Sequence, residues 1–308
     1  TKLDEALLPE LEINPEKIVL FTGSVAPEKR AMLWKNAQVI ISTPQGLEND
    51  VINKRVNLEE VSPGLYKLKD SIDSTRFLLS TEVSSIYSQG GKVRRVHTLI
   101  FAPSLGVVEK INKELTLRGA NLMSDGRPIV GLSAKAVAEI ALSVDPQCLI
   151  IPAHAWTPHF SLYGSMSGFD SIDECFGDLA KDIFAIETGL SSDPAMNWRI
   201  EELANRSIVS FSDAHSPEKL GREATVFELA KLDFESLRKA IIQDGKEKIA
   251  YTIEFYPEEG KYHFTGHRNC KVVYSPNDLR KMGLSCPVCG RALTIGVMSR
   301  VEHLASTD

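Results

Sequence analysis

Short apolar runs alternate with longer amphipathic stretches along most of this chain, and the alternation predicts repeated strand and helix units. The runs typical of strands are residues 76–83, 93–101, 149–151, 183–186 and 208–212. The stretches typical of helices are residues 107–117, 134–142, 197–204, 223–231 and 234–243. Such a repeat favours an α/β barrel or a layered sheet, in which functional side chains gather at the carboxyl ends of the strands.

The first sixty residues carry a separate pattern. Short β-branched runs at 17–21 and 39–42 are separated by a helical stretch that starts at Pro27 and runs through Trp34, and residues 45–54 read as another helix. This is a βαβα fragment of the kind that lays parallel strands in a sheet. Two strands do not complete such a sheet, so we expect the fragment to pack on the rest of the chain or on another chain.

Composition and charge narrow the class of protein. With 43% hydrophobic and 25% charged residues, the chain has the profile of a soluble globular protein, and no apolar run approaches the roughly 20 residues of a membrane span. No basic and apolar leader opens the chain, so we expect a cytoplasmic, nucleoid-associated location and no membrane partner. Thr1 at the start indicates a processed or incomplete beginning.

The charge is distributed unevenly. The net charge of −6 does not favour general binding to phosphates, but residues 261–302 hold seven Lys or Arg against two acids. A basic tail on an acidic body is compatible with DNA contact, and a solvated tail with a chance excess of base is the alternative.

Histidine and acidic side chains occur where several strand-like runs end. His154 follows one apolar run, and the pair Asp213-x-His215 follows another. In an extended backbone this spacing turns both side chains to the same side, so a carboxylate and an imidazole can share one divalent ion. Glu82 and His97 also lie at or near predicted strand ends, with a solvated acid and a surface histidine as the alternatives.

These positions predict metal-assisted hydrolysis. The expected ligands of zinc, manganese or magnesium are Glu82, His97, His154, Asp213 and His215, of which His154, Asp213 and His215 are the expected catalytic residues. No other cofactor is expected.

Two polar segments have the Gly, Asp and Pro content of turns. They are residues 125–128 (DGRP) and residues 187–194 (ETGLSSDP). The second immediately follows a strand, so its loop is expected to face the same mouth as His154 and Asp213. Trp198 and Arg199 just beyond it have the chemistry to stack on a base or hold a phosphate.

The tail carries the most specific local spacing in the chain. His267-x2-Cys270 is followed after fifteen residues by Cys286-x2-Cys289 and Gly290. Two ligand pairs with this spacing are typical of a structural tetrahedral zinc site. His263 competes with His267 for the fourth place, and buried cysteines without metal are the alternative. The remaining thiols, Cys148 and Cys175, read as small buried hydrophobes.

From about residue 63 to the end, the chain resembles endonuclease Q, a DNA repair nuclease with a PHP-type catalytic domain. The matching segments are RVH at 95–97, SDGRP at 124–128, PAHAWTP at 152–158, ETGLSSDPAMNWR at 187–199, SDAHSPEKLGRE at 212–223 and KYH at 261–263. The resemblance implies a distorted β/α barrel with a metal cluster and an appended zinc module. It also implies cleavage of DNA on the 5′ side of a deaminated base such as uracil or hypoxanthine, with the lesion flipped out of the stack.

The chain departs from this family at its start. PHP domains open with a His-x-His strand, and here no histidine precedes His97. Only the later ligands carry over, so the barrel is expected to be N-terminally incomplete and its cluster to bind ions more weakly. The expected DNA-binding residues are Trp198, Arg199, Arg222 and Lys261. Nothing in the sequence identifies a sliding clamp or other repair protein as a partner.

The opening resembles another family. Residues 22–24 (TGS), 27–30 (PEKR), 42–45 (STPQ) and 48–50 (END) are similar to the first RecA-like domain of superfamily 2 helicases of the Hef and FANCM type. The Walker A pattern and an acidic box are both missing from the chain, so this RecA-like βαβα fragment is not expected to bind ATP. A fusion near residues 58–63 is inferred, natural or made during gene assembly.

The expected domains are therefore residues 1–60 (helicase-like fragment), 61–258 (PHP-type nuclease) and 259–308 (zinc module). The leading hypothesis is a metal-dependent DNA repair endonuclease, impaired by its missing ligands. The alternatives are an inactive zinc-containing DNA-binding protein, a fragment of an ATP-dependent helicase and a phosphoesterase acting on small metabolites.

Overall fold

A four-stranded mixed sheet in the order β8-β6-β7-β9 lies at the centre of the molecule. The computed structural model describes residues 58–69, 75–122, 127–215 and 219–305, together with the backbone of 18–21 and 39–42. β6 (Ser80–Gln89) and β7 (Lys92–Phe101) form a long antiparallel hairpin. Its turn is Gly90-Gly91, with φ of 60° and 72°, a left-handed backbone that glycine adopts without steric cost.

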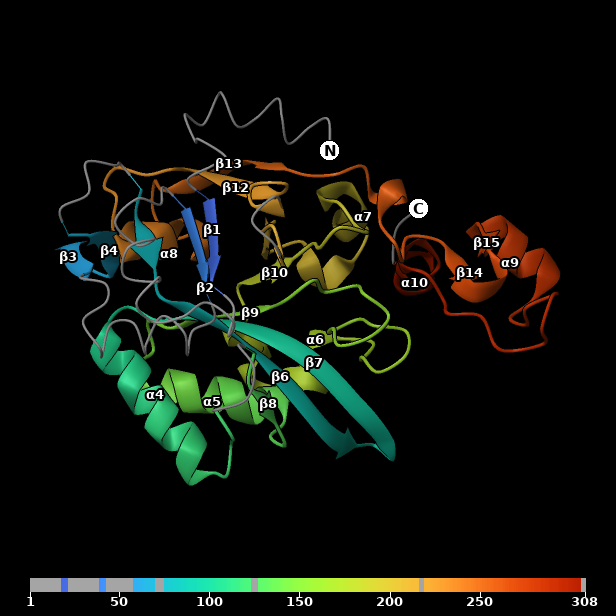
Figure 1. Ribbon diagram of the computed structural model, residues 1–308, viewed down its shortest axis with the longest axis horizontal. Coiled ribbons are helices and arrows are strands. Elements are labelled where there is room, and N and C mark those ends of the chain that lie inside the picture. The colour runs from blue at the N-terminus through green and yellow to red at the C-terminus, as the bar shows by residue number, and fades with distance from the viewer. Residues whose placement is uncertain are drawn as a thin grey trace.

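The sheet is covered on both faces. α4 (Leu105–Leu117) and α5 (Ala134–Val144) lie on one side of it, and α8 (Phe234–Ile242) lies on the other (Figure 1). β9 (Leu149–Pro152) has side chains in a hydrophobic cluster on each face of the sheet. Ile150 belongs to the larger cluster, whereas its neighbours Leu149 and Ile151 belong to the smaller one. A strand buried on both faces is uniformly apolar, which is the pattern that its sequence shows.

The two long helices are defined by their caps and stripes. The side chains of Ser104 and Ser133 accept hydrogen bonds from the third residue beyond them at the start of α4 and α5. In α4 the buried residues Val107, Ile111 and Leu115 recur every four positions and so form one stripe against the core. No helix in the described ranges is long and apolar enough to cross a bilayer.

Short strands in separate sheets complete the body. β10 (Ala185–Glu187) pairs with β11 (Ser207–Val209) in parallel, and β12 (Ala224–Glu228) pairs with β13 (Lys248–Ile253) in antiparallel orientation. β3 (Leu58–Ser62), β4 (Leu65–Leu68) and β5 (Phe77–Leu78) form a meander, and β8 (Ile129–Val130) runs parallel to β6. The described strands form an α/β arrangement of several sheets, and a closed barrel is not confirmed.

Shorter helices connect these strands. They are α6 (Ile172–Phe176), α7 (Pro194–Trp198) and the short 3₁₀ segments η2 (Gly177–Asp182), η3 (Glu201–Leu203), η5 (Pro257–Glu259) and η6 (Arg268–Cys270). α7 has Asp193 as its cap and Pro194 at its first turn, a favourable start for a helix.

Two expected helices differ in the structure. Residues 223–231 contain strand β12 instead of a helix, because Ala224–Glu228 finds a partner in β13, which lies about twenty residues further along the chain. Residues 197–204 hold only the end of α7 and the turn η3. The other expected strands and helices beyond residue 75 are confirmed with shifted ends, and β6 continues to Gln89 because it pairs along its length with β7.

The opening of the chain is described in part. The expected strands appear as β1 (Ile18–Phe21) and β2 (Val39–Ser42), paired in parallel. The expected helices at 27–34 and 45–54 lie outside the described residues. Among the described strands β1 and β2 pair only with each other, and a RecA-like fold is not confirmed.

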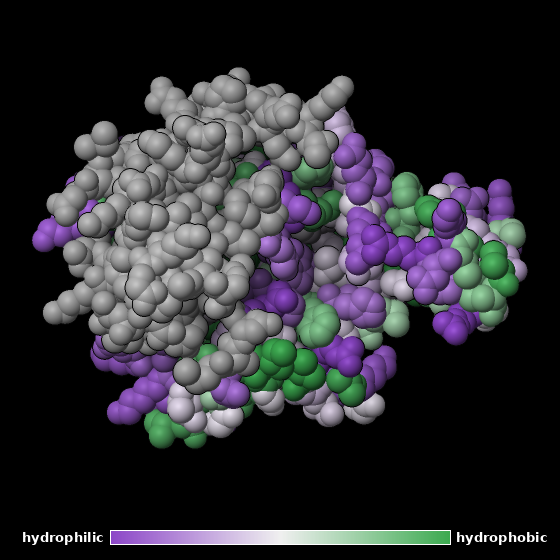
Figure 2. Space-filling view, viewed as in Figure 1, coloured by the Kyte–Doolittle hydropathy of each residue, from purple (hydrophilic) through white to green (hydrophobic). Residues whose placement is uncertain are grey.

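The C-terminal region stands at one end of the molecule (Figures 1 and 2). It contains β14 (Thr265–His267), β15 (Val272–Tyr274), α9 (Pro276–Met282) and α10 (Val297–Leu304). Its surface mixes hydrophilic and hydrophobic side chains in Figure 2. α10 nevertheless packs on the body, because Val297 and Val301 belong to the main hydrophobic cluster. The domain boundaries near residues 60 and 258 stay predictions.

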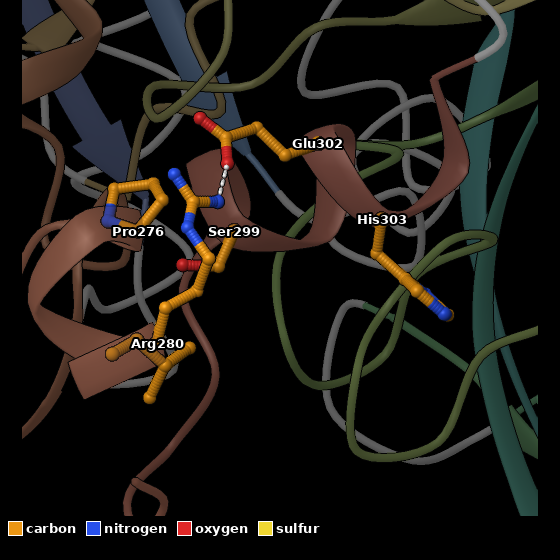
Figure 3. A pocket seen from close by; sticks show the side chains of 6 residues that line it. Pro276, Arg280, Ser299, Glu302 and His303 are labelled. Atoms are coloured by element: carbon orange, nitrogen blue, oxygen red, sulfur yellow. Dashed lines mark hydrogen bonds and ion pairs between the residues drawn. The ribbon is translucent and has the colours of Figure 1, made fainter. Parts of the chain in front are cut away.

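A cavity of about 220 Å³ separates α9 from α10. Figure 3 shows Arg280 of α9 reaching across it to Glu302 of α10, while His303 points away from this pair. The ion pair joins Nη1 to Oε2 at 2.9 Å. Arg280 is exposed and Glu302 is partly exposed, so this ion pair contributes at most about 1 kcal/mol to stability.

Candidate metal sites

Three of the predicted ligands converge on one point. Glu82 Oε1 lies 2.6 Å from His97 Nδ1 and 3.6 Å from His154 Nε2, and the two imidazole nitrogens are 3.0 Å apart. Both imidazoles are buried. Three atoms that carry lone pairs come this close only when a proton or a cation lies among them, so a divalent ion fits this donor set.

Strand register brings these ligands together. Ser84 pairs with His97, and Glu82 pairs with Leu99, so Glu82 and His97 lie on the same face of the hairpin. His154 follows β9, which pairs with β7, and the next contact beyond that ladder is Ala153 N–H donating to the His97 carbonyl at 3.1 Å. Neighbouring strands thus bring the three side chains together, with Glu82 and His97 inside the two central strands and His154 just beyond the end of β9.

Two hydroxyl groups orient the imidazoles. Thr157 Oγ1 donates to the carbonyl of His159 at 2.9 Å, so its contact of 2.9 Å with His154 Nδ1 is one in which Nδ1 donates. The other ring nitrogen, Nε2, then faces Glu82 and would bind an ion in its deprotonated form. For His97, Nε2 lies 3.1 Å from Ser84 Oγ, which leaves Nδ1 facing Glu82. Hydrogen bonds of this kind fix the ring and tautomer of a metal-binding histidine.

The electrostatics keep Glu82 charged. Burial alone raises its pKa, but hydrogen bonds and charge interactions with His154 and His97 hold the pKa far below its usual range. Burial lowers the pKa of His97. At His154 burial acts in the same direction, but the hydrogen bond with Glu82 and nearby carboxylates outweigh it and raise the pKa. The group is therefore a fixed negative charge beside two imidazoles.

Backbone conformation marks two of the predicted residues. His154 and Asp213 have φ of 32° and 43°, in the left-handed region that non-glycine residues seldom adopt. Gly189, with φ of 66°, lies against His154 so closely that a Cβ on it would be 2.7 Å from the His154 Cβ. Residues held this way cluster at functional sites.

Asp213 and His215 lie outside this three-residue group. The positive φ of Asp213 interrupts the extended backbone, yet the two side chains still meet: His215 Nδ1 lies 3.7 Å from Asp213 Oδ1 and 2.9 Å from the Asp213 carbonyl, and His215 is exposed. Arg222 holds the turn, since its guanidinium donates to the carbonyls of Ser212 at 2.6 Å and Asp213 at 3.0 Å. Asp213 is still near enough to contribute to the raised pKa of His154.

Sequence reasoning did not single out three ionisable residues that lie near the predicted ligands, Glu223 beside Asp213 and the other two beside the Glu82 group. Glu187 accepts a hydrogen bond from the His154 N–H at 2.7 Å, and burial raises its pKa to about 8. Burial also raises the pKa of Glu223 to about 7. Arg127 Nη1 lies 2.8 Å from Glu82 Oε1. Glu187 and Arg127 lie in segments whose composition predicted turns. The sequence signal that could have pointed to Glu187 as a site residue is its position at the end of a predicted strand.

The expected DNA-contacting residues have different surroundings. Trp198 is exposed, and Lys261 is exposed beside the Tyr262 ring at 4.7 Å. Arg199 is partly buried. Arg222 is engaged with the Asp213 turn, as described above. Trp198 and Lys261 are thus accessible to a partner.

A second group lies in the C-terminal region. His267, Cys270, Cys286 and Cys289 bring one ligand atom each within 4.8 Å of one another, and Cys289 Sγ is 3.3 Å from His267 Nδ1. Gly290 has φ of 73° and donates its N–H to the Cys286 carbonyl, which closes the expected knuckle turn. Three thiols and one imidazole are a donor set that suits tetrahedral zinc.

The competitor His263 is not part of this group. It is buried, and its Nδ1 lies 3.1 Å from the Ser191 carbonyl. The two remaining thiols, Cys148 and Cys175, are free and buried as expected.

The fold and the two groups define an α/β protein with two candidate metal sites, and comparison with solved structures places it more closely. The lesion-specific endonuclease PfuEndoQ from Pyrococcus furiosus is 30% identical with a TM-score of 0.72, over 93% of this chain and 69% of that one. Endonuclease Q in complex with a 27-mer duplex substrate with an abasic lesion at the active site is 30% identical with a TM-score of 0.74, over 94% and 72%. The chain belongs to the endonuclease Q family.

Curated relatives add partial matches, and no family model matches the chain. The uncharacterized protein YqxK of Bacillus subtilis is 30% identical over 261 residues, and the uncharacterized protein MJ0043 of Methanocaldococcus jannaschii is 38% identical over 159 residues. The chain spans 63% and 19% of the lengths of these relatives. The putative ATP-dependent RNA helicase MJ1505 of Methanocaldococcus jannaschii is 46% identical over 50 residues, which are 16% of this chain and 6% of that protein.

Proposed function

We propose that this chain is a metal-dependent DNA repair endonuclease that cleaves the strand on the 5′ side of a deaminated base such as uracil or hypoxanthine. The observation that carries the proposal is the convergence of Glu82, His97 and His154 in a member of the endonuclease Q family. Such an enzyme acts on chromosomal DNA and so at the nucleoid.

Glu82, His97 and His154 would hold a divalent ion, with Asp213 and His215 as further ligands supplied by the turn after β11. Zinc, manganese and magnesium suit these oxygen and nitrogen donors. When bound, the ion supplies an activated water and offsets the negative charge that develops on the phosphodiester.

The chain's own side chains prepare this site. Ser84 and Thr157 orient the two imidazoles so that His97 Nδ1 and His154 Nε2 face Glu82. Glu187, with a pKa of about 8, is largely protonated at pH 7, so it supports the His154 backbone without adding a full charge. Trp198 and Lys261 are exposed for base stacking and phosphate contact, and Arg199 lies next to Trp198.

The C-terminal group is proposed to bind structural zinc. A tetrahedral Cys₃His site folds its own loop around the ion, and the excess of Lys and Arg in residues 261–302 then lies on an ordered surface. Such a surface would contact the DNA backbone.

The test is strand nicking with labelled duplexes that contain one uracil or one hypoxanthine, compared with the undamaged duplex, in Mn²⁺ or Mg²⁺. We expect one product that ends on the 5′ side of the lesion, and we expect its loss in His154→Ala and Glu82→Gln. His303→Ala, which changes a histidine of α10 outside both groups, should nick like the parent. If the parent protein leaves all damaged duplexes intact, the proposed endonuclease activity is contradicted.

The comparisons do not favour the alternative of a zinc-containing protein that binds damaged DNA without cleaving it. Tight binding of the damaged duplex without any nicking, at saturating Mn²⁺, would support that alternative.

A further inference from the structure

Arg127 enters the Glu82, His97 and His154 group from the turn before β8. Its Nη1 is 2.8 Å from Glu82 Oε1 and 3.3 Å from His97 Nδ1. A guanidinium has only donors, so its hydrogen bond goes to the Glu82 carboxylate, and beside His97 Nδ1 it is a neighbouring positive charge. Glu82 Oε1 and His97 Nδ1 are also two of the three atoms that lie together in the candidate metal group.

The guanidinium and a divalent ion would compete for the same negative charge. An ion bonded to Glu82 Oε1 and His97 Nδ1 would lie close to Arg127 Nη1, which is 2.8 Å from that oxygen and 3.3 Å from that nitrogen. Two cations that share one carboxylate oxygen repel each other, so filling the site with metal weakens the contact of Arg127.

Arg127 is more exposed than either side chain that it contacts in this group. Its side chain is 38% exposed, compared with 20% for Glu82 and 6% for His97. As a cation, the guanidinium balances the negative charge of Glu82. Because this side chain is the more exposed one, it is the group that an incoming ion would displace toward solvent.

We propose that Arg127 is an internal cation that competes with the divalent ion for Glu82 and His97. The inference rests on the proposed function, because it takes the three-residue group as a metal site. It adds that metal binding is opposed by a side chain of the same protein, so the ion concentration needed to fill the site is set partly by Arg127.

The experiment is equilibrium binding of Mn²⁺ to the full chain, measured by the electron paramagnetic resonance signal of free Mn²⁺, on protein that carries one equivalent of zinc for the Cys/His group and no excess zinc. We expect Arg127→Gln to bind Mn²⁺ about tenfold more tightly than the parent, a change of about 1.4 kcal/mol. The matched control is Arg118→Gln, which changes an exposed arginine at the end of α4 and should leave the affinity unchanged. Glu82→Gln identifies the site, because it should abolish this binding.

A second variant and a second readout guard against misfolding. Arg127→Lys keeps the charge but lacks the planar guanidinium, so its affinity should fall between the other two. The rise in Tm caused by a fixed Mn²⁺ concentration should be larger in Arg127→Gln than in the parent, because tighter binding stabilises the folded state more. Equal affinity in the parent and both variants, with binding still lost in Glu82→Gln, overturns the role of Arg127 alone. If Mn²⁺ binding depends on Glu82 in none of these proteins, the metal site and the inference are both overturned.

Discussion

At the scale of single residues, hydroxyl groups decide which imidazole nitrogens face Glu82. Thr157 has already donated its proton to the His159 carbonyl, and this leaves it only as an acceptor toward His154 Nδ1. The metal-facing nitrogen is therefore set by a residue that lies outside the three-residue group. Ser84 has the corresponding position at His97.

Thr157→Val removes this acceptor without changing the shape of the side chain much. We expect Mn²⁺ affinity at the Glu82 group to fall by about tenfold to a hundredfold, because the His154 ring loses its tautomer and orientation. Thr116→Val is the control, since Thr116 is exposed on α4. Calorimetric titration measures both, and equal affinities would mean that the ring is held by packing alone.

Glu254 gives a residue-scale prediction of pH dependence. Burial raises its pKa from 4.5 to about 7, because the loss of solvation outweighs the contacts of the carboxylate with Thr252 and Thr188. A carboxyl group whose pKa is raised by folding favours the folded state in its protonated form. Its cost is small below about pH 4.5, grows as the pH rises toward 7 and is complete above that value.

Glu254→Gln should therefore raise stability at high pH and change it little at pH 5. We expect a gain of about 1 to 2 kcal/mol at pH 8, after allowing for screening by solvent. Thermal unfolding between pH 5 and 8.5 measures it, with the exposed Glu258→Gln as the control. A gain that is the same at every pH contradicts the titration and points to packing.

At the scale of elements, the hairpin of β6 and β7 is the frame of the site. It supplies Glu82 and His97 from paired strands and Ser84 directly opposite His97. Its tip is Gly90-Gly91, where a Cβ at either residue would meet no other atom within 4 Å, so only backbone conformation is at stake there.

Gly90→Ala and Gly91→Ala should each lower the free energy of unfolding by about 1 kcal/mol, because an L-residue is strained at positive φ. Gly106→Ala makes the same chemical change inside α4, where alanine is the better helix former, and should be neutral or stabilising. Urea unfolding compares the three. Equal effects at all three positions would show that the hairpin turn tolerates side chains.

The elements also show what sequence patterns can predict. Continuous apolar runs predicted β9, and four-residue spacing predicted α4, because both patterns are local. Residues 223–231 contain good helix formers and were expected to be helical, but pairing with β13 decides their structure. At the site, Glu82, His97 and His154 were expected, whereas the turn at Asp213 depends on Arg222 and could not be derived from spacing.

At the scale of the whole molecule, the two candidate metal sites lie in differently built regions. The Glu82 group is formed by long paired strands within the core, and the Cys/His group lies among β14, η6 and a short loop. A region with few buried apolar residues depends more on its metal for stability. Without zinc, the region built on β6 and β7 should therefore stay folded, whereas the turn that carries Cys286 and Cys289 should not.

His267→Ala and His263→Ala separate these roles. His267→Ala should lose close to one zinc ion per chain, with faster hydrogen exchange over residues 265–295 and little change in the body. His263→Ala should keep that zinc but lower the Tm, because His263 is buried against Ser191. Zinc content by atomic absorption and exchange by mass spectrometry test both. Loss of zinc in His263→Ala would mean that the zinc ligands are assigned wrongly.

Arg300 of α10 links the end of the described chain to the loop that follows His154. It donates to the carbonyls of Tyr163 at 3.0 Å and Phe169 at 2.9 Å, and it pairs with Asp170. The same loop provides the Phe160 carbonyl that accepts the His97 N–H. In a chimera that took its C-terminal region from a relative, a residue of that relative would replace Arg300 against the loop beside the metal ligands. An exchange that preserves these contacts must therefore transfer residues 157–170 together with α10.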